Sequence, residues 1–206
     1  LVTLVKFYVD IYLDRKGIIM EVLGALIIAQ ILFIAVVTKI AIVAGNARAY
    51  RVGLFIWLAG IFCLASFTPD TSKTLIVCIA ALTGCGVAGG LVIPINILSF
   101  TTDVDELITG KRREGIYAGL LTFMRKVVQA LAIVLVGVTL DIIGINSKLS
   151  STGQTEAALQ GLRYTMFVLP ATFLIMGLIA SYFFKLSPEN HKILLEEIER
   201  LKGGGK

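Results

Sequence analysis

Long apolar segments, each close to the length that crosses a lipid bilayer, restrict the fold of this chain more than any other feature. Five such segments occupy residues 17–38, 52–68, 74–99, 114–143 and about 160–184. The hydrocarbon core of a bilayer is about 30 Å thick, so about 20 helical residues are needed to cross it. Because a helix satisfies its own backbone hydrogen bonds, it is stable in lipid. The sequence therefore predicts an all-α membrane protein.

The composition supports several membrane spans rather than one water-soluble core. Hydrophobic residues make up 57% of the 206 residues and charged residues only 16%, whereas soluble domains have about 45–50% and about 25%. Cys63, Cys78 and Cys85 fall inside apolar segments and lack the spacing of a zinc site or a disulfide framework. The sequence shows no nucleophile triad and no phosphate-binding loop. An enzyme is therefore not expected.

The distribution of Lys and Arg predicts how the spans are oriented. The basic connection at residues 39–51, the connection before residue 114 and the C-terminal tail hold more Lys and Arg than the connections on the opposite side. Cytoplasmic loops carry an excess of these residues. We therefore expect a plasma (inner) membrane protein with a cytoplasmic C-terminus, and attribute the net charge of +5 to this topology rather than to nucleic-acid binding.

The chain is expected to have two parts. Residues 1–185 would form a transmembrane half of six helices, and residues 186–206 a cytoplasmic amphipathic helix with a flexible tail. The apolar run 1–13 is too short to span a bilayer. We therefore expect a truncated first helix, with the N-terminal part of a longer protein missing.

Two local signals predict how the spans pack and begin. Small residues in the fourth apolar segment allow a close approach of neighbouring helices, namely Gly84, Gly86, Gly89 and Gly90. Thr155 is expected to cap the last span, since its hydroxyl can accept a hydrogen bond from a free backbone N–H.

Arg125 and Lys126 lie in the middle of an apolar segment. At 1.5 Å of rise per residue they are roughly 17 Å past Glu114, near the centre of the hydrocarbon core. A charge at that depth costs at least about 2.5 kcal/mol. These cations therefore require a polar cavity or a counter-charge, and we interpret this helix as lining the path of a transported substrate.

Thr122, Lys126 and Gln129 follow an i, i+4, i+7 pattern, which places them on one face of a helix. An ammonium group offers three hydrogen-bond donors, so this face suits hydroxyl-rich or anionic substrates. The alternative is a structural Lys126 paired with a carboxylate of a neighbouring helix. Arg125, about 100° away from Lys126, is interpreted as a structural partner rather than a substrate ligand.

A charged loop is predicted between residues 99 and 114, with Asp103, Asp105 and Glu106 followed by basic residues 111–113. The acidic residues could form a metal or acid–base site, but no His lies near them. A gate of salt bridges between cytoplasmic loops is the favoured interpretation. We assign this gate to Asp103, Glu106, Arg112 and Arg113, and no metal site is assigned.

With these features in place, the chain resembles the glycoside–pentoside–hexuronide:cation symporters of the major facilitator superfamily, whose best-known member is the melibiose permease. The resemblance covers essentially the whole chain, as the C-terminal six-helix bundle of such a transporter. Its most specific parts are residues 103–107, 109–117 and 122–126, with further support from residues 45–50, 155–159 and 186–201.

The resemblance implies a function and a set of partners. The implied function is symport of a sugar or glycoside with Na⁺ or H⁺ by alternating access, with Lys126 facing the sugar cavity and Thr122 at a neighbouring polar position. The coupling cation would be bound mainly by the N-terminal half, and no other cofactor is implied. The alternatives are a lipid-like or other organic substrate, or a membrane scaffold that transports nothing.

Overall fold

The computed structural model describes residues 2–111, 113–145 and 153–183, and these residues form helices without any strand. In chain order the elements are α1 (Val2–Phe7), the π-helical turn η1 (Tyr8–Tyr12), the 3₁₀ turn η2 (Lys16–Ile18), α2 (Ile19–Ala44), α3 (Asn46–Ala65), α4 (Lys73–Thr109), α5 (Glu114–Ile142) and α6 (Glu156–Tyr182). Helices α2 to α6 are long and apolar enough to cross a membrane. The predicted all-α membrane fold is confirmed. The predicted amphipathic helix at 186–206 lies outside the described residues.

The connection between α2 and α3 is shorter than expected. Residues 39–51 are helical except at Gly45, whose φ of 92° reverses the chain within one residue. This backbone conformation is open to glycine and unfavourable for other residues. Hydropathy marks where the lipid ends, whereas a helix ends only where its backbone hydrogen bonds end. Charged residues therefore continue both helices into the interface.

The predicted loop after residue 99 is also largely helical. Helix α4 continues to Thr109 and ends at Gly110, which adopts the left-handed conformation (φ 66°). Asp103, Asp105 and Glu106 therefore lie on the last turns of α4 and not in a loop. The expectation was wrong because acidic side chains end the apolar pattern but leave the backbone hydrogen bonds of the helix intact.

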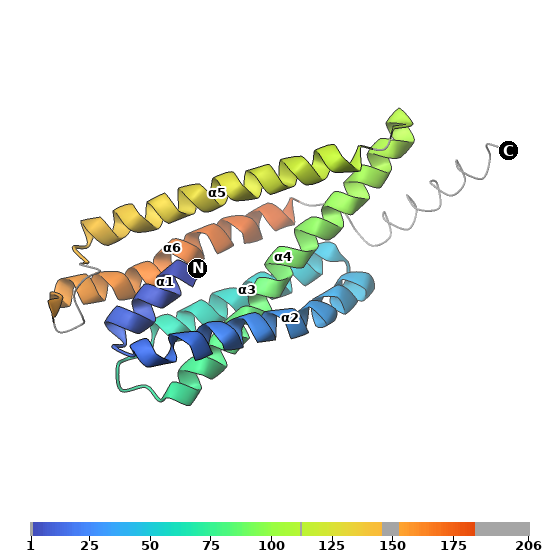
Figure 1. Ribbon diagram of the computed structural model, residues 1–206. Coiled ribbons are helices and arrows are strands. Elements are labelled where there is room, and N and C mark those ends of the chain that lie inside the picture. The colour runs from blue at the N-terminus through green and yellow to red at the C-terminus, as the bar shows by residue number, and fades with distance from the viewer. Residues whose placement is uncertain (1, 112, 146–152, 184–206) are drawn as a thin grey trace.

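Helices α2, α3 and α4 form the most closely packed part of the bundle. In Figure 1, α4 runs across α2 and α3, while α5 lies along the edge of the molecule beside α6. The glycines of α4 contact backbone atoms of the neighbouring helices: a Cβ built on Gly84 meets the Leu26 carbonyl of α2, and one on Gly86 meets the backbone of Trp57 in α3. The predicted close approach is confirmed.

A second packing centre lies where α1 and η1 meet the starts of α2, α4 and α6 and the ends of α3 and α5. The Tyr8 hydroxyl lies 2.8 Å from the Leu64 carbonyl oxygen, to which it donates, and 3.2 Å from that of Phe67. The Arg163 side chain donates from Nε to the Ala65 carbonyl at 2.7 Å. These side chains donate to carbonyls at and just beyond the C-terminal end of α3, where the regular hydrogen bonds of the helix end.

The start of α6 has the predicted cap. The hydroxyl of Thr155 accepts a hydrogen bond from the Ala158 backbone N–H at 3.2 Å. This bond satisfies one of the free N–H groups of the first helical turn.

Replacing Gly84 by Ala should weaken the contact between α4 and α2. The added methyl group would meet the Leu26 backbone, which cannot move away as a flexible side chain would, so we expect a loss of about 1–3 kcal/mol. The midpoint of thermal unfolding in detergent measures this. Gly24→Ala in α2 is the matched control, because nothing lies within 4 Å of a Cβ at that position. Equal midpoints for the two variants would contradict the proposed contact.

Candidate functional site

Helix α5 carries the predicted substrate-binding residues and is the least buried span. Only 6% of its most apolar window is buried, against 44% in α4. Thr122, Lys126 and Gln129 all lie on it with exposed side chains. The C-terminal third of α5 is anchored, because Val136 and Leu140 are buried against the second packing centre.

Arg125 and Lys126 have exposed side chains and form no hydrogen bond or ion pair with any residue in the described ranges. The predicted alternative, a structural Lys126 paired with a carboxylate of a neighbouring helix, therefore has no such partner within this part of the chain. The same holds for the structural pairing expected of Arg125. The two cations lie at the middle of a span and pair with no acidic residue of the described ranges.

Three of the predicted gate residues lie at the end of the bundle where α4 meets α5. Asp103 is exposed on α4, Glu106 is half-buried one turn later, and Arg113 is exposed immediately before α5. Arg112 lies outside the described residues. No ion pair joins Asp103, Glu106 and Arg113 within the described ranges, so the structure does not bring these three residues together as a closed gate.

The structure singles out Asp105, which the gate assignment omitted. Its Oδ2 is buried and has no hydrogen-bond partner among the described residues. Asp105 lies three residues after Thr102, which is buried on the same side of α4. The sequence carries no signal for this burial, because it shows neither that the helix continues past residue 99 nor which side of that helix packs against its neighbours.

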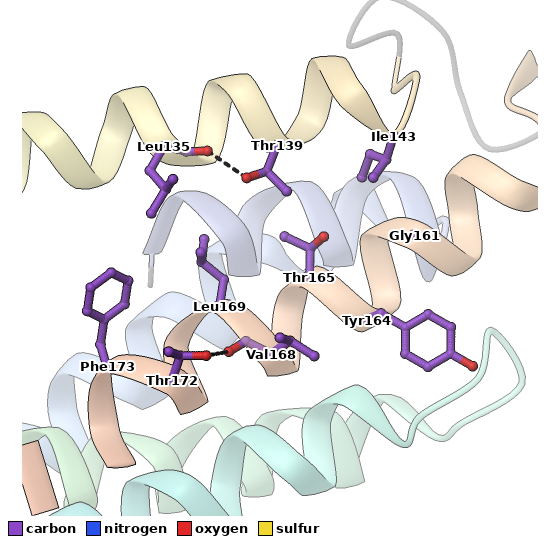
Figure 2. A pocket seen from close by; sticks show the side chains of 10 residues that line it. All are labelled: Leu135, Thr139, Ile143, Gly161, Tyr164, Thr165, Val168, Leu169, Thr172 and Phe173. Atoms are coloured by element: carbon purple, nitrogen blue, oxygen red, sulfur yellow. Dashed lines mark hydrogen bonds between the residues drawn. The ribbon is translucent and has the colours of Figure 1, made fainter. Parts of the chain in front are cut away.

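A groove of about 550 Å³ lies between the C-terminal part of α5 and α6 (Figure 2). Its lining is almost wholly apolar, with Thr139 on α5 and Phe173 on α6 at its sides. The hydroxyls of Thr139 and Thr172 donate to the carbonyls of Leu135 and Val168 in their own helices. The remaining hydroxyls of the lining are those of Tyr164 and Thr165, so the groove offers few hydrogen-bonding groups to a hydroxyl-rich molecule. Thr122, Lys126 and Gln129 are not among its lining residues.

Comparison with known proteins gives a consistent family. The family model described as "MFS/sugar transport protein" matches residues 1–188. A putative sulfoquinovose importer of Escherichia coli is 33% identical over 162 residues, which are 77% of this chain and 33% of that protein. An uncharacterized symporter of Synechocystis is 31% identical over 153 residues, which are 73% of this chain and 28% of that protein.

A third relative is more distant. A glucuronide carrier protein homolog of Escherichia coli is 26% identical over 102 residues, which are 50% of this chain and 22% of that protein. The chain thus spans about a third or less of the length of these three relatives.

Cysteine labelling tests whether the polar face of α5 meets water. In a cysteine-free background of the full-length protein in membranes, Cys at 122, 126 or 129 should react with a membrane-impermeant thiol reagent. Leu131→Cys is the control: it is 64% exposed in this fold but lies about 140° around the helix from Lys126, where lipid should block the reagent. Equal labelling of all four positions, or of Leu131→Cys alone, would contradict the assignment.

Proposed function

The chain belongs to the MFS/sugar transport protein family, and from that membership we propose that it is the C-terminal half of a cation-coupled symporter of a sugar or glycoside. One observation carries the proposal: Lys126 is exposed at the middle of α5 without a described partner. An ionisable residue inside a membrane faces a polar cavity or a partner in almost every case. A substrate path supplies such a cavity, whereas a scaffold has no need of a cation there.

The exposed length of α5 supports a binding site between two halves. Repeat-built transporters bind substrate near the middle of the membrane at the interface of their repeats. Thr122, Lys126 and Gln129 would line this half of the cavity, and their side chains can donate hydrogen bonds to sugar oxygens. We assign the Na⁺ or H⁺ site mainly to the N-terminal half.

The proposed orientation places the C-terminus in the cytoplasm of a plasma (inner) membrane protein. The α2–α3 turn, the α4–α5 connection and the end of α6 lie at the same end of the bundle (Figure 1). The exposed cations Lys39, Lys111 and Arg113 lie at this end. Their gathering on one side supports a cytoplasmic face.

The apolar groove between α5 and α6 favours one competing function, the transport of a lipid-like substrate. A volume of about 550 Å³ is within the range of small-molecule sites, which are about 300–1,000 Å³. The groove does not include Lys126, so this function would leave the mid-membrane cation without a purpose. Sugar symport is therefore the preferred proposal.

Uptake of labelled glycosides, pentosides and hexuronides by the complete two-half transporter, with and without Na⁺ and proton gradients, tests the proposal. We expect gradient-dependent uptake of one sugar, and a loss of about tenfold or more in Lys126→Ala, since hydrogen bonds to charged groups contribute about 1.5–3 kcal/mol. Lys39→Ala, which removes an exposed cation near the end of α2, should retain uptake. A lack of sugar uptake by protein shown to reach the membrane would refute the proposal and favour a lipid-like substrate or a scaffold.

The proposal that Asp103, Glu106, Arg112 and Arg113 form a cytoplasmic gate makes a separate prediction. Reversing the charge in Asp103→Lys or Arg113→Glu should lower the rate of turnover much more than the affinity for substrate, because a gate acts on the conformational change and not on the binding site. Initial rates at saturating substrate and equilibrium binding measure the two effects. Asp70→Lys, in the exposed turn between α3 and α4, is the control. Equal losses of rate and affinity would argue against a gate.

A further inference from the structure

Arg125 and Lys126 are the charged residues of the central membrane layer. The central parts of α2 to α6 are residues 25–36, 53–62, 77–99, 118–138 and 166–180, all within the described ranges. Apart from Arg125 and Lys126, these segments contain no Asp, Glu, Lys or Arg. The central segments of α2 to α6 therefore hold two adjacent positive charges and no acidic residue.

No ion pair joins these cations to an acidic residue within the described ranges. On α5 itself, Glu114 lies about 17 Å from Arg125 along the axis and Asp141 about 22 Å from Lys126. Between side chains in the described ranges there is one salt bridge, Lys73 to Glu21 at 2.7 Å, and it lies at the start of α4.

Arg125 belongs to the same polar face as Lys126. It follows Thr122 by three residues and precedes Gln129 by four, and α5 is helical throughout this stretch. At 100° per residue, all four polar side chains fall within one arc of about 100°. The residues between and beyond them, from 118 to 138, are apolar or glycine. One face of α5 thus offers two cations flanked by a hydroxyl and an amide.

We propose that the substrate is an organic anion, a sugar or a similar hydroxylated molecule with a carboxylate or sulfonate group, and that Arg125 and Lys126 hold this group. The inference rests on the proposed transport function. A guanidinium binds the two oxygens of an oxyanion through parallel hydrogen bonds, and an ammonium adds a point charge. Thr122 and Gln129 would bind the hydroxyl groups of the same molecule.

Charge balance favours an anionic substrate over a neutral one. Two uncompensated positive charges in a cavity of low dielectric repel a coupling cation strongly. An anion that enters with the cation removes this repulsion, so its binding and that of the cation would support each other. Carboxylates of the N-terminal half are the competing source of negative charge, and in that arrangement the site would accept neutral sugars.

Matched substrates separate these two arrangements. The complete transporter is tested with methyl glucoside against methyl glucuronide, and with glucose against its 6-deoxy-6-sulfonate, under an imposed Na⁺ or proton gradient. We expect the anionic member of at least one pair to be taken up with a kcat/KM at least about tenfold higher than its neutral partner, the effect of one hydrogen bond to a charged group.

Variants then locate the charge recognition. Arg125→Gln and Lys126→Gln should each lower the preference for the anion about tenfold or more, while Lys126→Arg and the interfacial control Lys39→Gln should keep it. Surface expression is measured for each variant, and the wild-type preference decides the question if a variant fails to fold. A wild-type preference for neutral sugars, or a preference unchanged in both Gln variants, would overturn this inference and leave sugar symport standing. If the transporter takes up neither member of any pair and no other sugar, both proposals are refuted.

Discussion

Contact between helix backbones holds the described bundle together. At Gly84 and Gly86, α4 approaches α2 and α3 so closely that a single methyl group would collide with main-chain atoms. In lipid, where burying apolar side chains between helices brings little gain, such close packing is the main source of attraction between them. Tight packing of α2, α3 and α4 defines a compact unit, and the remaining helices are placed relative to it.

The position of α5 outside this unit is what makes a functional site possible. Its C-terminal third is fixed by the burial of Val136 and Leu140, whereas its middle is exposed along with Arg125 and Lys126. A helix packed on all sides could not hold two unpaired cations, because burying an unpaired charge is very costly. The middle of α5 can therefore carry these charges because it is loosely packed, and its exposed side requires a polar environment.

Cations at the ends of spans have a different role from those in the middle. Arg163 donates to the carbonyl of Ala65 at 2.7 Å, and Arg15 to that of Pro69 at 2.9 Å. Where α3 begins and α6 ends, Arg51 donates to the carbonyl of Ser181 at 3.3 Å and lies over the ring of Tyr182. These arginines tie neighbouring elements together through free carbonyls or aromatic rings. Arg125 and Lys126 have no such bonds within the described ranges, which distinguishes them as candidates for binding a substrate.

The sequence by itself determined the class of fold, the approximate position of each span, the glycine contacts of α4 and the polar face of α5. These features follow from residue type, hydropathy and helical spacing, which can be read along the chain without knowing which helices pack together. It failed at the helix ends near Gly45 and Gly110, because a charged residue stops an apolar pattern without stopping backbone hydrogen bonding. Only the tertiary structure decided that Arg163 binds a carbonyl, whereas Lys126 and the buried Oδ2 of Asp105 have no partner among the described residues. Partnership depends on which helices meet at a given depth, and residues as far apart as Ala65 and Arg163 are brought together only by packing.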